Sequence, residues 1–446
     1  MDQDGYKTRG KQRAVPRGRA QRFGKFASLA GGVAGNMLAH GTAQLAAGKR
    51  PRVKDLLLTP KNALRLTQQL AEMRGAAMKL GQILSMDTGD LLPRELADIL
   101  AALRNTAYAM PDAQLHEVLA QELGPDYEIK LKHFEERPFA AASIGQVHRL
   151  STRQGQPAVL KVQYPGVRES IDADVDNLAG LLRVSGLLPK HLDMAPLLAE
   201  AKSQLHGEAD YEQEARYLRA FVKALGEDER FLLPRVIPHL SASRALGMTF
   251  VPGVPIEDVA FEDAQERNRV AALLFELLMI ELFELRLVQT DPNFANYQYN
   301  RDTGQVVLLD FGASRRFSAA LVRSYRDLLA GAVDGDRKTM VKAAESVGYQ
   351  LGPEGSLYQQ TLLELADIVL VPLTLNAPYD FGNSPIPQQL MQRIEPLKSD
   401  RSFWEVPPVD VAYIHRKIGG LFMLAARLNA KVNVHELLVP WLQNRG

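Results

Sequence analysis

The sequence predicts a two-lobed α+β fold, in which a helical extension precedes a sheet-rich N-terminal lobe and a mostly helical C-terminal lobe. Between Tyr127 and Val162, short apolar segments such as Ile129–Leu131 alternate with turns, which is the pattern of an antiparallel sheet. Helical spacing of apolar residues dominates from Asn62 to Met86 and again beyond Ser318. We therefore expect a basic arm with a small-residue helix at 1–50, the helical extension at 51–125, the N-terminal lobe at 126–251 and the C-terminal lobe at 252–446.

The composition narrows the class of protein. A chain of 446 residues is long enough for two or three packed units. A hydrophobic content of 46% and a charged content of 24% fit a globular protein. The formal net charge of +1 gives no electrostatic case for nucleic acid as a partner. The absence of cysteine excludes disulfides, thiolate metal sites and cysteine nucleophiles. We expect no transmembrane span, because every long apolar run is interrupted by polar or charged residues.

The N-terminus is strongly basic. Lysine and arginine recur from Lys7 to Lys25 and face only two acidic residues, Asp2 and Asp4. Such an arm can contact acidic lipid headgroups at a membrane surface. The alternative is a solvated, partly disordered tail, and the sequence leaves both interpretations open.

A Lys-Leu-Gly-Gln motif lies inside the first predicted helix. Lys79 and Gln82 are three residues apart, so a helix brings both side chains to one face. Gly81 costs roughly 1 kcal/mol of helix stability relative to alanine. A helix tolerates that cost where another backbone approaches closely.

A run of small residues, Ala140-Ala141-Ala142-Ser143, joins two of the predicted strands. A strand–loop–strand of small residues can place backbone N–H groups against phosphates. Alanine in place of glycine stiffens such a loop and narrows its backbone choices. Small residues also occur in hairpins that have no function, so the loop by itself leaves both interpretations open.

Lys161 ends an Ala-Val-Leu-Lys strand, where a buried ammonium group is costly unless its charge is paired. The expected partner lies on one long helix from Ala195 to Leu225, which carries Glu208, Glu212 and Glu214. Such a density of acidic residues is also typical of a solvated helix face. The sequence alone does not choose between these alternatives.

The centre of the chain carries the strongest signal. A long apolar run from Val270 to Val288 predicts a buried helix, and Asp291 follows it with Asn296 five residues further on. A short apolar strand then leads into Asp310-Phe311-Gly312. Kinase-like sites present a base and metal-binding oxygens in this way, and Mg²⁺ prefers such hard oxygen ligands. An ordinary turn that happens to carry Asp and Asn is the alternative.

The segment between Gly312 and the next predicted helix is short. Ser318 already opens a predicted helix, Ala319 to Val333. Protein kinases place a long activation segment and an Ala-Pro-Glu motif between these points, and this sequence has neither. We therefore expect that the usual platform for a peptide substrate is absent.

Taken together, these motifs resemble the UbiB-type atypical kinases, a protein-kinase-like family linked to ubiquinone biosynthesis. The resemblance spans roughly residues 10–440, and the sequence of the Gln289–Asn293 motif is closer to the mitochondrial-type branch. The sequence ends without the C-terminal membrane helices of some bacterial members, so we expect no anchor of that kind. The matching positions are Lys79, Gly81 and Gln82, the loop Ala140–Ser143, Lys161, Glu208 with Asp210, Asp291 with Asn296, and Asp310–Gly312.

The resemblance implies a protein-kinase-like fold and a catalytic centre for ATP and Mg²⁺. Lys161 would contact the nucleotide phosphates and pair with Glu214. Asn296 and Asp310 would hold Mg²⁺, and Asp291 would stand where a catalytic base stands.

The resemblance also implies a closed site. Lys79 and Gln82 would fold over the active site and meet Glu208 and Asp210, which would exclude a protein substrate. The alanine-rich loop is similar to a device that alters nucleotide preference and restrains self-phosphorylation.

The implied function is a Mg-ATP-dependent ATPase or phosphotransferase that supports isoprenoid-quinone biosynthesis. Its partners would be ATP and ADP, an anionic membrane surface, prenyl-phenol lipids and proteins of quinone biosynthesis. We expect peripheral membrane association on the cytoplasmic or mitochondrial matrix side. The alternatives are a small-molecule kinase of a lipid-like hydroxyl and a non-catalytic scaffold that binds nucleotide.

Overall fold

The computed structural model describes residues 109–142, 144–185, 194–291, 293–395 and 408–443. The chain forms two compact units. The first comprises the chain up to Arg219 together with Arg235–Phe250, and the second comprises Ala220–Pro234 and Val251–Gly446. The predicted N-terminal helices, with Lys79 and Gln82, lie outside the described residues, as does Ser143. The predicted boundaries at residues 50 and 125 therefore stay predictions.

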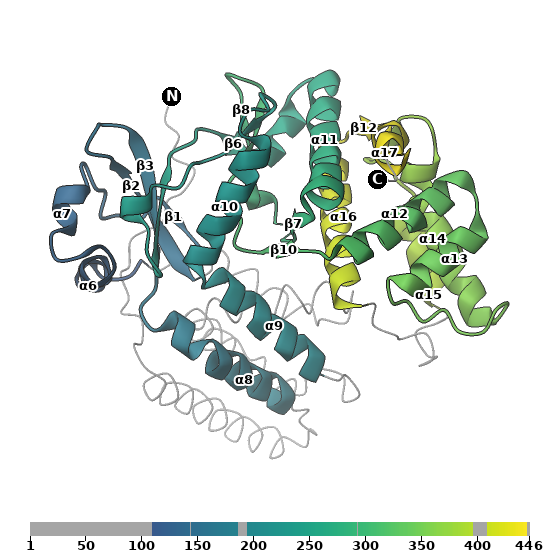
Figure 1. Ribbon diagram of the computed structural model, residues 1–446, viewed down its shortest axis with the longest axis horizontal. Coiled ribbons are helices and arrows are strands. Elements are labelled where there is room, and N and C mark those ends of the chain that lie inside the picture. The colour runs from purple at the N-terminus through teal and green to yellow at the C-terminus, as the bar shows by residue number, and fades with distance from the viewer. Residues whose placement is uncertain (1–108, 143, 186–193, 292, 396–407, 444–446) are drawn as a thin grey trace, which may run out of the picture. The chain divides into compact units, whose positions relative to one another are not determined.

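A four-stranded antiparallel sheet forms the centre of the first unit, in the order β1-β2-β3-β5. Gly155, with φ +82°, makes the tight turn between β2 and β3. Helices α8 and α9 lie side by side in Figure 1. The strands are β1 (Ala140–Ala141), β2 (Gly145–Ser151), β3 (Pro157–Gln163) and β5 (Ala245–Thr249), and the helices are α6 (Asp112–Leu123), α7 (Tyr127–Lys130), α8 (Val167–Ser185), α9 (Ala195–Glu208) and the first part of α10 (Tyr211–Leu225).

Two secondary-structure predictions for this unit are wrong. Residues Ile129–Leu131 do not form a strand, because the turn after Gly124 starts the short helix α7, and only the bridge from Lys132 to Ser151 joins this region to the sheet. The predicted single helix from Ala195 to Leu225 is two helices that break at Asp210. The Asp210 carboxylate accepts a hydrogen bond from Gln213 N (2.8 Å), which caps the N-terminus of α10.

The second unit contains a four-stranded sheet in the order β4-β9-β8-β6, in which only β4 and β9 run parallel. Its strands are β4 (Phe231–Leu232), β6 (Val254–Pro255), β8 (Tyr297–Asn300) and β9 (Gln305–Leu308). Two further antiparallel pairs are β7 (Leu287–Gln289) with β10 (Ser314–Arg316), and β11 (Tyr379–Asp380) with β12 (Lys431–Val432). The helices around them are α11 (Ala264–Met279), α12 (Ala319–Asp334), α13 (Arg337–Ser346), α14 (Leu357–Thr374), α15 (Ile386–Ile394), α16 (Val409–Arg427) and α17 (Val434–Gln443).

The prediction of one buried helix from Val270 to Val288 is wrong. Helix α11 ends at Met279, and a π-helical turn, Ile280–Leu285, continues it. Arg286 then adopts a left-handed conformation (φ 50°) that stops the helix and directs the chain into β7. Because π-helical turns often mark functional sites, this junction draws attention to the residues that it presents.

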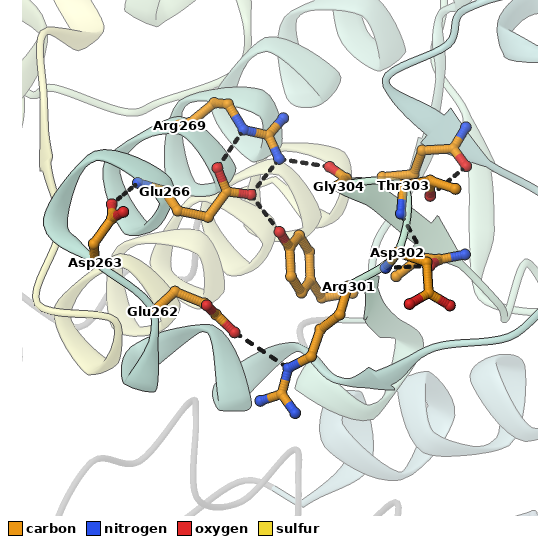
Figure 2. Close-up of polar contacts among 11 residues, drawn as sticks. Glu262, Asp263, Glu266, Arg269, Arg301, Asp302, Thr303 and Gly304 are labelled. Atoms are coloured by element: carbon orange, nitrogen blue, oxygen red, sulfur yellow. Dashed lines mark hydrogen bonds and ion pairs between the residues drawn. The ribbon is translucent and has the colours of Figure 1, made fainter.

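A polar network ties the start of α11 to the β8–β9 hairpin (Figure 2). Arg269 donates hydrogen bonds to Glu266 (2.7 Å) and to the Gly304 carbonyl (2.5 Å). Arg301 of the hairpin forms an ion pair with Glu262 at 3.2 Å. The network fixes the β8–β9 hairpin. The Asp291–Asn296 segment leads into this hairpin, and Asp310 follows it. Among the helices that the structure describes, none is both long and apolar enough to cross a bilayer.

Candidate functional site

Lys161 and Glu214 form a buried ion pair in the first unit. The Lys161 ammonium lies 2.9 Å from both carboxylate oxygens of Glu214, and the two residues are 7% and 1% exposed. Strand β3 supplies the lysine, and the first turns of α10 supply the glutamate. The structure thus brings Glu214, among the acidic residues considered, to Lys161. The carboxylate partner offsets the cost of burying the lysine charge.

The packing around this pair fixes α10 against the sheet. The Lys161 ammonium lies 5.1 Å from the centroid of the Tyr211 ring, and Tyr211 is fully buried. A Cβ atom at Gly145 would lie 2.4 Å from the Val162 carbonyl oxygen and 2.7 Å from the Tyr211 hydroxyl, so only glycine fits there. Gln163 also donates a hydrogen bond to the Ala209 carbonyl at 3.1 Å. Tyr211 therefore sets where Glu214 meets Lys161.

The alanine-rich loop forms a tight hairpin. Ala140 and Ala141 make up β1 and pair with Val147 and Gln146 of β2, and Ala142 N donates to the Gly145 carbonyl at 2.9 Å. The hairpin itself thus uses the N–H group of Ala142. The proposed contact between this loop and phosphates stays a prediction.

The two acidic positions of the Glu208-Ala209-Asp210 segment differ in their local roles. Glu208 is the last residue of α9, and Asp210 caps α10 through Gln213 N. Since Lys79 and Gln82 lie outside the described residues, the predicted meeting of these four side chains stays a prediction.

Asp291 and Asn296 lie together in the second unit. The Asn296 Nδ2 group donates to Asp291 Oδ2 at 3.1 Å and to the Asp291 carbonyl at 3.4 Å. The Asn293 side chain caps the short 3-10 turn Phe294–Asn296 by accepting from Ala295 N at 3.1 Å. On the other side of Asp291, Arg416 Nη2 of α16 lies 3.8 Å from Oδ1. The loop therefore presents one carboxylate between an amide and a guanidinium.

Asp310 lies two residues after β9, whose last residue, Leu308, pairs with Tyr297, the residue after Asn296. Leu309 N donates to the Asn296 carbonyl at 3.1 Å, so the residue after Leu309 lies beside Asn296. Asp310 Oδ1 accepts from Gly312 N at 2.9 Å, which shapes the Asp-Phe-Gly turn. Phe311 is buried, and its ring centroid lies 4.9 Å from that of Phe221. The turn is thus anchored by its apolar residue, and the backbone just before its acidic residue is hydrogen-bonded to Asn296.

The donor set at this place fits Mg²⁺. The Asn296 amide donates its nitrogen to Asp291 and also carries a carbonyl oxygen, and Asp310, which follows the backbone contact between Leu309 and Asn296, carries a carboxylate. Within the described ranges, no three His, Cys, Asp or Glu residues gather into a metal cage. Mg²⁺ ordinarily binds one or two protein oxygens and takes its remaining ligands from phosphates and water. The residues present therefore match an ion that arrives with a nucleotide.

A buried polar triad, Glu281, Tyr297 and Lys417, lies next to the Asp291–Asn296 loop. Lys417 Nζ of α16 lies 3.2 Å from Glu281 in the π-helical turn and donates to the Tyr297 hydroxyl at 2.5 Å. Burial raises the pKa of the Glu281 carboxyl, and the Lys417 charge opposes that rise. Burial works to lower the pKa of Lys417, but Glu281 and Tyr297 outweigh it, so the pKa is raised and Lys417 stays protonated. The triad joins α16 to the residue that follows Asn296.

Sequence reasoning missed Arg416, Lys417 and Tyr211. Lys417 interrupts an otherwise apolar face of α16, and an unexplained lysine on such a face is a signal that could have identified it. Arg416 and Tyr211 carry no motif. The role of Arg416 depends on its contact with Asp291, which is distant in the sequence. The role of Tyr211 depends on its close approach to Gly145, which leaves no space for a Cβ atom.

Comparisons with known proteins all point to atypical kinases. A family described as "ABC1 atypical kinase-like domain" matches residues 102–344. The chain is 37% identical over 435 residues to "Atypical kinase COQ8, mitochondrial" of Saccharomyces cerevisiae, covering 96% of this chain and 85% of that protein. It is 36% identical over 431 residues to "Atypical kinase COQ8B, mitochondrial" of Rattus norvegicus, covering 96% and 81%.

A solved structure shares the architecture. The complex of Rv3197 with erythromycin from Mycobacterium tuberculosis has a TM-score of 0.59 and 26% sequence identity, and the match covers 84% of this chain and 94% of that one. The predicted protein-kinase-like α+β fold and the resemblance to the mitochondrial-type branch are therefore confirmed.

Proposed function

Because the chain belongs to the ABC1 atypical kinase family and is thus a kinase-like enzyme, we propose that it binds ATP with Mg²⁺ and transfers the γ-phosphoryl group to water or to a small hydroxyl acceptor. The buried ion pair between Lys161 and Glu214 is the strongest support for this proposal, because kinase-like sites use a lysine paired with a helix glutamate to contact the nucleotide phosphates.

The residues divide the chemistry between them. The oxygen of water or of a hydroxyl attacks the γ-phosphorus, the bond to the β-phosphate oxygen breaks, and ADP leaves. Asp291 orients the attacking group and accepts its proton. Asn296 and Asp310 would hold Mg²⁺, which, when bound, neutralises charge on the phosphates. Asn296 also keeps Asp291 in place through its 3.1 Å hydrogen bond.

The chain after Asp-Phe-Gly favours a small acceptor over a peptide. Between Gly312 and helix α12, the backbone forms only β10, which pairs with β7. Ser318 caps α12 by accepting from Leu321 N at 3.1 Å. A peptide platform of the protein-kinase type needs a long activation segment, and this stretch has no room for one.

We place this activity in isoprenoid-quinone biosynthesis at a membrane surface. The relatives named as mitochondrial atypical kinases support this assignment, as does the basic N-terminal arm with its chemistry for anionic lipid. Prenyl-phenol lipids and proteins of quinone biosynthesis are the partners that fit, with peripheral association on the cytoplasmic or matrix side.

Calorimetric titration with Mg·ADP and Mg·ATP tests the proposal. Lys161→Met should weaken binding of both nucleotides, whereas Lys223→Met, an exposed lysine on the same helix as Glu214, should leave it unchanged. Asp291→Asn should keep nucleotide affinity and lose turnover. Wild-type protein that binds nucleotide without turnover would favour a scaffold, and the absence of binding would overturn the proposal.

A further inference from the structure

The Asp291–Asn296 loop lacks a positive charge of its own. Its sequence, Asp-Pro-Asn-Phe-Ala-Asn, contains no lysine or arginine. Transfer of a phosphoryl group spreads negative charge over the equatorial oxygens of the transferring group, and enzymes place cations there in addition to Mg²⁺. A cation for this position must therefore come from another part of the chain.

Helix α16 brings such a cation to the loop. Arg416 Nη2 lies 3.8 Å from Asp291 Oδ1, and the two side chains are only 12% and 17% exposed. That distance is longer than a direct hydrogen bond between these atoms. Asp291 Oδ2 is already held by Asn296, so Arg416 faces the oxygen on the other side of the carboxylate.

The position of Arg416 is fixed by its neighbours on α16. Lys417 is buried between Glu281 and Tyr297, which ties the centre of the helix to the π-helical turn and to β8. At the start of the helix, Asp410 accepts a hydrogen bond from Arg315 of β10 at 2.8 Å. Helix α16 is thus fastened to the segments before and after Asp310, which fixes the backbone from which the Arg416 side chain extends.

We propose that Arg416 is a further catalytic residue that contacts the transferring phosphate beside Asp291. This inference rests on the proposed ATP-dependent function. The Asp291 carboxylate holds the guanidinium in place until the nucleotide arrives, and the phosphate oxygens then take up its N–H groups. A planar guanidinium matches the geometry of a phosphate better than an ammonium does.

Nucleotide titration separates this role from a structural one. Mg·ADP lacks the γ-phosphate, whereas the Mg complex of the β,γ-imido analogue of ATP carries it. We expect Arg416→Gln to lower affinity for the imido analogue about tenfold more than affinity for ADP, which corresponds to the loss of one charge-assisted contact. We expect ATP turnover to fall about a hundredfold.

Two further variants complete the test. Arg416→Lys keeps the charge but not the fork, so it should fold and recover only part of the discrimination between the two nucleotides. Arg427→Gln, at the C-terminal end of the same helix, should match wild type. Equal loss of ADP and imido-analogue affinity in the Arg416 variants, or wild-type turnover in Arg416→Lys, would overturn the inference. Wild-type protein that binds neither nucleotide would instead overturn the proposed function.

Discussion

The buried ion pair between Lys417 and Glu281 gives a sharp prediction about stability. Each residue is 1% exposed, and the Lys417 ammonium also serves the Tyr297 hydroxyl. Lys417→Met keeps most of the side-chain volume but leaves the Glu281 carboxylate buried without its partner. Breaking a buried pair in this way costs about 3–5 kcal/mol. We expect the free energy of unfolding of the second unit to fall by about that amount.

Tryptophan fluorescence during urea unfolding measures this change in the second unit. The chain has two tryptophans, and Trp404→Phe leaves Trp441 as the single probe. The Trp441 ring stacks on Phe283, with centroids 6.3 Å apart, and Phe283 belongs to the same π-helical turn as Glu281. The probe therefore reports on the element that the substitution disturbs.

Two matched variants decide how the result is understood. The double variant Glu281→Met with Lys417→Met should recover most of the lost stability, because two apolar side chains replace the pair without leaving a charge. Arg301→Gln removes a half-exposed pair with Glu262 (48% and 33% exposed) and should cost about 0–1 kcal/mol. A double variant as unstable as the single one, or a Lys417→Met cost below about 1 kcal/mol, would refute the reasoning.

Three further predictions concern the first unit. Gly145→Ala should cost about 1–3 kcal/mol in thermal unfolding followed by circular dichroism, because its Cβ would meet the Val162 carbonyl at 2.4 Å. Burial lowers the pKa of His148 to about 4 from 6.5, so its stabilising contribution is complete above pH 6.5 and is lost as the pH falls toward 4. Hydrogen exchange in β2 should show that the free energy of unfolding falls by about 3 kcal/mol between pH 6.5 and 4. His148→Gln should remove this pH dependence. Glu214→Gln should weaken Mg·ATP binding about tenfold in calorimetry, since Lys161 loses its ionic partner; unchanged affinity would contradict its role.

The order of motifs was enough to predict the fold. A strand that carries Lys161, an Asp with an Asn five residues on, and a strand that leads into Asp310 occur in the order that a kinase-like chain requires. Each of these signals is local, because the strand or turn that presents the residue is written in its immediate neighbours. The residues alone left several glutamates open as partners of Lys161, the family resemblance implied Glu214, and the structure has that pair at 2.9 Å.

Other features depend on contacts that a single sequence does not display. The apolar run from Val270 fits one long helix, whereas the structure has a π-helical turn in which Glu281 contacts Lys417 and after which Arg286 directs the chain into β7. The break at Asp210 follows from its capping hydrogen bond, which competes with continuation of the helix. Arg416 meets Asp291 only after α16 has packed, so no local pattern could predict the contact.

Mg-dependent ATP turnover by purified protein tests the central claim most directly. The assay compares wild type with Asp310→Asn, each with and without anionic liposomes. We predict turnover by wild type that requires Mg²⁺ and rises with liposomes, and its loss in the variant, because in our proposal the Asp310 carboxylate binds the metal together with Asn296. Turnover that is unchanged in Asp310→Asn, or the absence of turnover in wild type under both conditions, would contradict the claim.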